Sequence, residues 1–153
     1  MITNLTHLNE DGEANMVDIS AKGVVHREAI ASGKIFLSKK TIELVKTNML
    51  KKGDVIATAR IAAINGAKKT SELIPLCHNI LINKIDVSFS IEENYINITS
   101  KTICDAKTGI EMEAITAVSV AAITIYDMCK AVDKNMEISE IKLIKKTKGK
   151  RQV

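Results

Sequence analysis

The segment GIEMEAITAVSVAAITIYDMCK, residues Gly109–Lys130, decides the fold of this chain. Its central three turns are almost wholly apolar, which predicts a long buried helix. Charged residues stand only at the ends of the segment, with Glu111 and Glu113 at one end and Asp127 and Lys130 at the other. This pattern favours a core helix that delivers charged groups to a site. Because the apolar residues cover most directions around the helix axis, we also expect an oligomer that buries a second side.

The clearest strand lies just before this helix, at Ile85–Ile91, where apolar and polar residues alternate with a period of two. Glu92–Asn94 reads as a turn, and Tyr95–Cys104 reads as the antiparallel partner strand. Before these strands we expect a strand at 24–37 with a possible bulge at Gly33, followed by helices at 39–50 and 55–73 that are capped by Ser38 and Asp54. After them we expect the long helix, which ends near Val132, and a strand at 136–146 with a bulge near Ser139–Glu140. With the first two helices merged, this order predicts an α+β, ferredoxin-like fold, an antiparallel sheet with helices packed on one face.

The length and composition indicate one domain over residues 1–153, with a polar N-terminal arm (1–22) and a basic C-terminal tail (145–153) that we expect to be flexible. Six of the 22 basic residues lie in the last twelve positions, which contain no acidic residue. The remainder of the chain therefore has 16 basic and 18 acidic residues. This local basicity favours one anionic ligand or a solvated tail. Four aromatic residues provide few platforms for base stacking, so we expect no nucleic-acid partner.

The three cysteines and three histidines show no spacing typical of a metal site or a disulfide framework. We therefore expect no bound metal. The N-terminus has neither a basic start nor a long apolar run, so no signal peptide or membrane span is indicated. A cytoplasmic protein without a membrane partner is the resulting prediction.

Several charged residues have both an ordinary and a functional interpretation. Asp127 and Lys130 are one helical turn apart, and from spacing alone a surface ion pair is the commoner outcome, although such a pair can also perform acid–base work. Lys52 precedes a helix N-terminus, where it is either a solvated loop lysine or a phosphate ligand. Lys68 on an apolar stripe either extends toward water or reaches into a pocket.

The segment Ile74–His78 combines a proline turn with adjacent cysteine and histidine. It can present backbone groups and an imidazole to a ligand, whereas a Cys–His nucleophile pair is disfavoured because adjacent residues rarely face each other. The histidine more commonly donates to a backbone carbonyl. Met112 is either core filler or a pocket wall. The basic tail is either a solvated end or a lid over a polyphosphate.

Six segments, in order along nearly the whole chain, together resemble the cyclic pyranopterin monophosphate synthase family (molybdenum cofactor biosynthesis protein C). Each segment alone is weak, but the combination is highly specific. The segments are Met16–Ser20 (MVDIS), Lys52–Asp54 (KGD), Ala57–Ala62 (ATARIA), Leu73–His78 (LIPLCH), Thr108–Ala114 (TGIEMEA) and Ile125–Val132 (IYDMCKAV).

The resemblance implies a ferredoxin-like subunit in a hexamer of three dimers, with sites at the dimer interface. It implies an enzyme of molybdenum cofactor biosynthesis, a phosphorus–oxygen lyase. The expected reaction converts (8S)-3′,8-cyclo-7,8-dihydroguanosine 5′-triphosphate into cyclic pyranopterin monophosphate and releases diphosphate. The expected partners are thus a GTP-derived small molecule and further copies of the chain.

The resemblance also implies roles for individual residues. Asp127 is the expected catalytic acid–base residue, with Lys52 and Lys130 as catalytic partners. The expected substrate-binding residues are Leu76, Cys77, His78, Glu111, Met112 and Glu113, with Asp18, Arg27, Lys68 and Lys146 near the base or triphosphate. Repeated proton transfers during ring opening and closure suit lysines and a carboxylate, and a diphosphate leaving group suits cations.

The end of the chain departs from the family pattern, because Lys148 stands where the family usually carries a glycine and the tail is short. This departure bears on the flexibility of a closing lid and on the role of Lys150. An alternative function is a non-catalytic ferredoxin-like sensor that binds a nucleotide polyphosphate.

Overall fold

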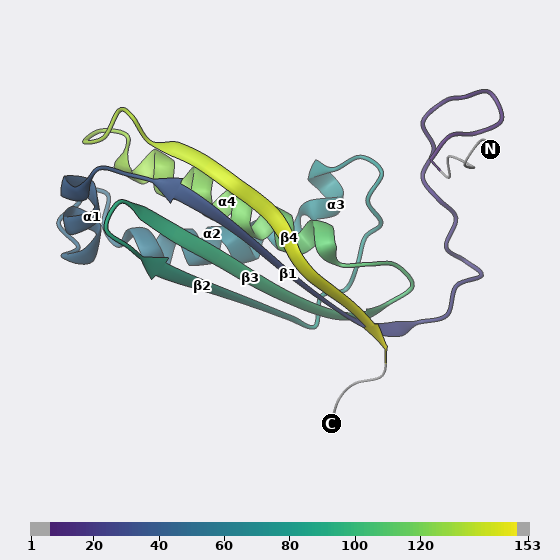
Figure 1. Ribbon diagram of the computed structural model, residues 1–153. Helices are drawn as coiled ribbons and strands as arrows, with labels where there is room; N and C mark the ends of the chain where they lie inside the picture. The colour runs from purple at the N-terminus through teal and green to yellow at the C-terminus, as the bar shows by residue number, and fades with distance from the viewer. Residues whose placement is uncertain (1–6, 150–153) are drawn as a thin grey trace.

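Four antiparallel strands form one sheet in the order β2-β3-β1-β4, and helices cover one of its faces (Figure 1). The computed structural model describes residues 7–149. The strands are β1 (Val25–Phe36), β2 (Lys84–Ile91), β3 (Tyr95–Ala106) and β4 (Glu137–Gly149), and the helices are α1 (Lys39–Lys46), α2 (Val55–Lys68), α3 (Thr70–Leu73) and α4 (Glu111–Cys129). This arrangement confirms the predicted α+β, ferredoxin-like architecture.

The two central strands carry the core. β1 and β3 pair without interruption from Val25 opposite Ala106 to Phe36 opposite Tyr95. Alternate residues of both strands are buried, namely Ala29, Ala31 and Ile35 on β1 and Ile96, Ile98, Ser100, Thr102 and Cys104 on β3. Because side chains alternate between the faces of a strand, these residues share the face covered by α4.

β4 bends around the edge of the sheet through bulges. Ser32 pairs with Lys142 and Lys34 pairs with Ser139, so Glu140 and Ile141 lie opposite Gly33 alone. Glu140 adopts a positive φ of 53°, which confirms the bulge predicted near Ser139–Glu140. A Cβ atom on Gly33 would lie 2.8 Å from Val118 and 2.9 Å from Ile141. The glycine therefore allows β1 to pass close beneath α4 and the bulge.

Two predicted helices are shorter than expected. The helix predicted over 39–50 ends at Lys46, because Asn48 turns into the left-handed region with a φ of 54°. The helix predicted over 55–73 breaks at Lys69, which separates α2 from the single-turn α3. The long helix predicted to end near Val132 ends at Cys129. None of these differences changes the order of the layers.

The last strand is longer than predicted. β4 continues past Lys146 to Gly149, because residues 145–149 pair with the first residues of β1. The described part of the expected basic tail is therefore strand. Residues 1–6 of the expected arm and residues 150–153 of the tail, with Lys150, lie outside the described residues.

α4 is buried from two sides. Its inner side packs on the sheet, and α2 packs beside it, where a Cβ atom on Gly66 would lie 2.7 Å from Val120. α2 of the same chain thus buries part of the apolar surface that extends around α4. By length and composition α4 could cross a membrane, but most of its residues lie inside this core, as in core helices of water-soluble proteins.

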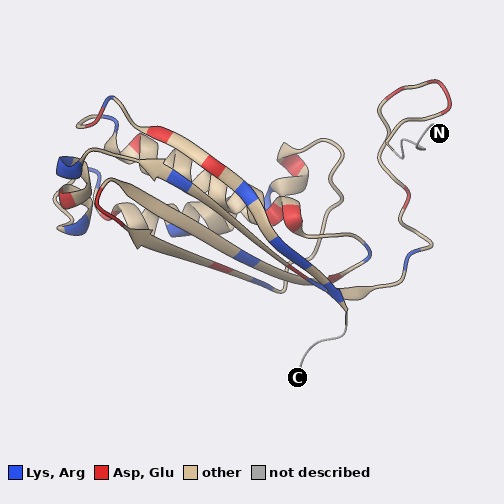
Figure 2. Ribbon diagram, in the orientation of Figure 1, with Lys and Arg blue, Asp and Glu red and all other residues tan. Residues whose placement is uncertain are grey.

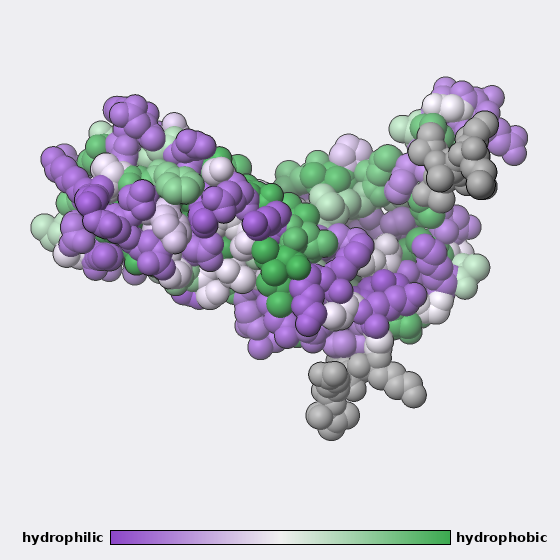
Figure 3. All heavy atoms as spheres, viewed as in Figure 1, coloured by the Kyte–Doolittle hydropathy of each residue, from purple (hydrophilic) through white to green (hydrophobic). Residues whose placement is uncertain are grey.

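Some apolar side chains remain at the surface. On α4, Ile123 is 60% exposed and Tyr126 is 37% exposed. On the helix layer, Ile61 and Leu73 are also exposed. Figure 3 shows hydrophobic residues gathered near the middle of the visible face, over β4 and toward α3. These residues leave apolar area that the single chain does not cover.

Candidate functional site

Three predicted catalytic residues meet at the C-terminal end of α4. The Lys130 ammonium lies 2.7 Å from Oδ1 of Asp127, and the Lys52 ammonium lies 2.8 Å from Oδ2. Lys52 also donates to the backbone carbonyl of Asp127 at 2.8 Å. We call these three residues the lysine–aspartate centre.

Local structure brings Lys52 to this centre from far away in the sequence. Gly53 turns the chain with a φ of 92°, and Asp54 then caps α2 by accepting from the backbone N–H of Ala57 at 2.9 Å. Lys52 is thereby held over the end of α4. Asp127 and Lys130 follow from the helical period alone, because residues three apart are neighbours on a helix surface.

The centre is strongly polarised although it is exposed to water. Hydrogen bonds from Lys130 and Lys52 lower the pKa of Asp127 to about 2. The same contact with Asp127 raises the pKa of Lys130. In the unliganded protein near neutral pH, one carboxylate thus lies between two ammonium groups. Such a centre has one net positive charge available for an anionic ligand.

The predicted substrate-binding segments meet at the other end of α4. They line a cavity of about 270 Å³, which we call the α4 N-terminal cavity. Its lining includes all six residues of the two segments, namely Leu76, Cys77, His78, Glu111, Met112 and Glu113, together with His7, Val17, Ile19, Lys22, Ile80, Thr108 and Gly109. The residues predicted to bind the substrate thus lie together around one cavity.

Glu113 is the most unusual side chain of this cavity. It is only 3% exposed, and its Oε2 atom has no hydrogen-bond partner within residues 7–149. Burial raises its pKa to about 6, and the nearby Glu111 carboxylate adds to the increase. An unpaired buried carboxyl is costly unless a ligand or a proton satisfies it. Glu113 is therefore suited to accept hydrogen bonds from a bound molecule.

The N-terminal segment closes one side of the same cavity. The His78 ring is bonded to the carbonyl of Val17 at 2.7 Å, and Lys107 donates to the carbonyl of Ser20 at 2.9 Å. The Asp18 carboxylate accepts from the backbone N–H of Ser20 at 2.8 Å. The Ser20 side chain and, to a smaller extent, this backbone hydrogen bond lower the pKa of Asp18. His78 thus makes the ordinary contact with a backbone carbonyl rather than a nucleophile pair with Cys77, whose pKa is raised by burial.

Residue-level reasoning missed Val17, Ile19, Lys22 and Thr108 as cavity walls. Val17 and Ile19 flank Asp18 in the family-like segment Met16–Ser20, and Thr108 opens the family-like segment Thr108–Ala114, whereas Lys22 lies in neither. The apolar neighbours of Asp18, and not Asp18 itself, line the cavity.

A second cavity, of about 370 Å³, adjoins the first through Gly109 and Glu111, which line both. We call it the basic cavity. Its lining comprises Arg27, Glu28, Gly109, Ile110, Glu111, Lys146, Thr147 and Lys148. Three predicted residues thus meet here: the Lys146 ammonium lies 3.2 Å from the Glu111 carboxylate, and Arg27 lies on the facing strand.

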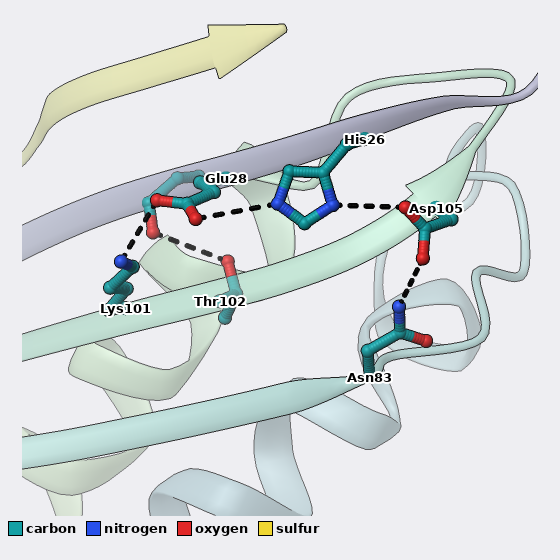
Figure 4. A network of polar contacts seen from close by, with 7 residues as sticks. His26, Glu28, Asn83, Lys101, Thr102 and Asp105 are labelled. Carbon is teal, nitrogen blue, oxygen red and sulfur yellow. Dashed lines mark hydrogen bonds and ion pairs between the residues drawn. The ribbon is translucent and has the colours of Figure 1, made fainter. Parts of the chain in front are cut away.

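Arg27 and its neighbours fix the loop that leads into α4. The Arg27 guanidinium donates to the carbonyls of Ala106 and Lys107 at 3.1 and 3.2 Å. On the other face of the sheet, His26 bridges Asp105 and Glu28 at 2.9 and 3.4 Å (Figure 4). The network continues as Lys101 contacts Glu28 and Asn83 donates to Asp105. Glu28 is therefore already paired with the Lys101 ammonium.

Lys68 lies apart from the other predicted residues. It lines a third cavity, of about 390 Å³, whose walls include Ile64, Ile80, Ile82 and Lys84. The sequence left open whether Lys68 extends toward water or reaches into a pocket, and the structure places it at a pocket. That pocket shares only Ile80 with the α4 N-terminal cavity.

The lysine–aspartate centre and the α4 N-terminal cavity are well separated within one chain. Glu113 and Asp127 are fourteen residues apart on one helix, or about 21 Å along its axis at the rise of an α-helix. Figure 1 shows α4 running beneath the sheet from the side of α3 to the side of α1. Within one chain the predicted catalytic and substrate-binding residues therefore lie in two separate groups, which we call the two half-sites.

No group of three or more His, Cys, Asp or Glu side chains within residues 7–149 is placed to hold a metal ion. The chemistry of the two half-sites is that of carboxylates and ammonium groups. Together they offer hydrogen-bond acceptors at one end of α4 and an acid–base centre at the other.

Comparison with known proteins identifies the family of this chain. The MoaC family model matches residues 16–149. A cyclic pyranopterin monophosphate synthase of Peptoclostridium acidaminophilum is 54% identical over 145 residues, covering 95% of this chain and 92% of the relative. Proteins of the same name from Clostridium acetobutylicum and Heliobacterium modesticaldum are 55% and 51% identical, covering 95% of this chain and 91% and 93% of the relatives. Because the family match spans the described strands and helices and both half-sites, this chain belongs to the MoaC family.

Proposed function

We propose that this chain is a cyclic pyranopterin monophosphate synthase of molybdenum cofactor biosynthesis. It converts (8S)-3′,8-cyclo-7,8-dihydroguanosine 5′-triphosphate into cyclic pyranopterin monophosphate and diphosphate. The observation that carries the proposal is identity of 51–55% to proteins of that name over 95% of the chain. The contacts within the two half-sites support the proposal, because they supply the groups that this reaction needs.

The reaction needs a base, an acid and cations. Closing the cyclic phosphate joins a hydroxyl oxygen of the substrate to the α-phosphorus, breaks the bond from that phosphorus to diphosphate, and transfers the hydroxyl proton to a base. Rearrangement of the purine-derived ring adds further proton transfers. Asp127 with Lys52 and Lys130 is proposed for this acid–base work, since each lysine already shares a hydrogen bond with the carboxylate.

The α4 N-terminal cavity is proposed to hold the base of the substrate. Leu76–His78 and Met112–Glu113 supply backbone groups, and the Glu113 carboxyl accepts hydrogen bonds that no described side chain now provides. Arg27 and Lys146 in the basic cavity, together with Lys68, are proposed for the anionic part of the substrate. Asp18 is proposed to contact the substrate, because it lies in the N-terminal segment whose Val17 carbonyl is hydrogen-bonded to His78.

A complete site is proposed to form between two copies of the chain. Met112 and Lys130 are eighteen residues, or five whole turns, apart on α4, so they lie on one face of the helix. Ile123 and Tyr126 are exposed on that same face. A second copy laid antiparallel along it brings the lysine–aspartate centre of one chain to the α4 N-terminal cavity of the other. This geometry supports the expected dimer-interface site and, with it, a hexamer built of three dimers.

The remaining proposals concern the setting of the enzyme. We propose a cytoplasmic protein that needs no cofactor and binds neither nucleic acid nor membrane. A nucleotide-polyphosphate sensor without turnover is not favoured, because relatives that cover nearly the whole chain are named as synthases. A sensor would also have no use for a lysine–aspartate centre far from its binding cavity.

Turnover by the purified protein tests the proposal directly. The cyclised GTP intermediate is mixed with the protein, and cyclic pyranopterin monophosphate and diphosphate are measured by mass spectrometry. We expect both products from the wild type and none from Asp127→Ala, Lys52→Ala or Lys130→Ala. Lys134→Ala is the matched control, because that lysine follows the same helix end without contacting Asp127.

The variants also separate the possible failures. A folded wild-type assembly that binds the intermediate without forming product would reject the synthase and favour the sensor. Wild-type rates in all three lysine–aspartate variants would show that the catalytic centre lies elsewhere. Unchanged circular dichroism and native mass establish that each variant remains folded and assembled.

A further inference from the structure

Lys148 lies on the same face of β4 as Lys146 and beside Arg27. The register sets Lys146 opposite Ala29 and Lys148 opposite Arg27. Ala29 is buried under α4, and side chains of directly opposed residues share a face, so Lys146 and Lys148 belong to the α4 side of the sheet. Figure 2 shows basic residues along β4 toward its C-terminal end. Three cations therefore surround the basic cavity.

The charges of the basic cavity do not cancel. Glu28 is paired with Lys101 and His26, and Glu111 is paired with Lys146. Among residues 7–149, the Arg27 side chain is hydrogen-bonded only to neutral carbonyl groups, and the Lys148 side chain makes no hydrogen bond or ion pair. Two full positive charges, on Arg27 and Lys148, are thus left for a ligand.

The backbone at this place adds to the positive potential. α4 begins at Glu111, and its N-cap residue Ile110 supplies no side-chain cap, so the first N–H groups of a 19-residue helix remain without one. Ile110 and Gly109 both line the basic cavity. Its volume of about 370 Å³ is that of a small-molecule site. The basic cavity therefore combines room, uncancelled charge and a helix N-terminus.

We propose that Lys148 is a further substrate-binding residue that contacts the phosphate chain of the triphosphate. This inference rests on the proposed function. Because Gly109 and Glu111 line both cavities, a base in the α4 N-terminal cavity leaves its phosphates beside Arg27, Lys146 and Lys148. No role for Lys148 follows from the family resemblance.

Lys145 provides a matched control for Lys148. It lies on the same strand, three residues away, but opposite Ile30 on the other face of the sheet, and it does not line the basic cavity. Loss of either lysine removes one charge from the same strand. Only the Lys148 change should remove a contact with the ligand, whereas any general effect of net charge appears in both variants.

Steady-state kinetics at low ionic strength test the contact. We expect Lys148→Ala to raise KM for the cyclised GTP intermediate about tenfold with kcat within about twofold, as for loss of a charge-assisted contact made before the chemical step. Lys148→Arg should stay within about threefold of the wild-type KM, since it keeps the charge. Lys145→Ala should change KM by less than about twofold, because an exposed charge outside the cavity is screened.

Calorimetric titration with inorganic triphosphate gives a readout that does not need turnover. Its Kd should rise in Lys148→Ala and stay unchanged in Lys145→Ala. Equal KM and Kd values for the two alanine variants would overturn the role of Lys148, while product formation by the wild type would leave the proposed function intact. If the wild type forms no product, the proposed function fails, and the titration still decides whether Lys148 binds the phosphate chain.

Discussion

Glu113 links the stability of the protein to the chemistry of its cavity. Burial of this carboxyl raises its pKa to about 6 from a usual value of 4.5. The folded protein therefore holds the proton more tightly than the unfolded chain does. By linkage, the free energy of unfolding falls as the pH rises from about 4.5 to about 6, and it stays lower above that range. A buried carboxyl of this kind lowers the free energy of unfolding and is typical of a functional site.

Replacing Glu113 by glutamine should remove this dependence on pH. We expect the free energy of unfolding of Glu113→Gln, relative to the wild type, to improve by about 2 kcal/mol between pH 4.5 and pH 8, from the size of the pKa shift. Urea unfolding at a series of pH values measures the difference. Glu72→Gln, at an exposed position on α3, should show no such trend. Parallel curves for the wild type and Glu113→Gln would contradict the raised pKa.

At the scale of elements, Gly66 sets how closely α2 approaches α4. A Cβ atom at this position would lie 2.7 Å from Cγ2 and 2.9 Å from Cβ of Val120. Alanine normally favours a helix over glycine by about 1 kcal/mol, but overpacking costs about 1–3 kcal/mol. Close contact between these helices holds α2, and with it the loop that carries Lys52, against α4.

The substitution Gly66→Ala should therefore destabilise the protein by up to about 2 kcal/mol, the balance of those two effects. In a Val120→Ala background the same substitution should become neutral or stabilising, because the clashing methyl groups are gone. Denaturant unfolding of the four proteins of this cycle gives the coupling. Gly23→Ala, where nothing lies within 4 Å of an added Cβ, serves as the control. An unchanged cost in the Val120→Ala background would show that the two helices are not in tight contact.

Local patterns in the sequence were sufficient for some elements and not for others. Alternation predicted β2 and β3, and the slip in parity predicted the bulge at Glu140, because side-chain period is a local property. The extension of β4 to Gly149 depends on pairing with β1, more than a hundred residues away, so the basic run alone read as a tail. The break at Lys69 likewise has no proline or glycine to mark it.

The candidate site was predictable in its parts but not in its layout. Spacing brings Asp127 to Lys130, and the family-like segments name most walls of the α4 N-terminal cavity. Only the tertiary fold brings Lys52 to Asp127 and Lys148 to the basic cavity. The distance between the two ends of α4, about 21 Å from Glu113 to Asp127 at the helical rise, also follows only once the helix is placed.

For the molecule as a whole, the separation of the two half-sites along α4 can be tested by mixing two inactive variants. If each complete site takes the lysine–aspartate centre from one chain and the α4 N-terminal cavity from another, two different defects can be separated by mixing. A dimer of Asp127→Ala with a cavity variant such as Met112→Arg contains one site with both defects and one site with neither. A site contained in a single chain cannot be restored in this way.

We therefore expect activity to return when Asp127→Ala and Met112→Arg are mixed in equal amounts, unfolded and refolded together. Half of randomly formed dimers are mixed and each has one intact site, so recovery should reach about one quarter of the wild-type rate. Asp127→Ala refolded with Lys130→Ala should recover nothing, because both defects lie in the same half-site. Light scattering should show the wild-type assembly in every mixture. Absence of recovery in assembled mixtures would contradict a site that is shared between two chains.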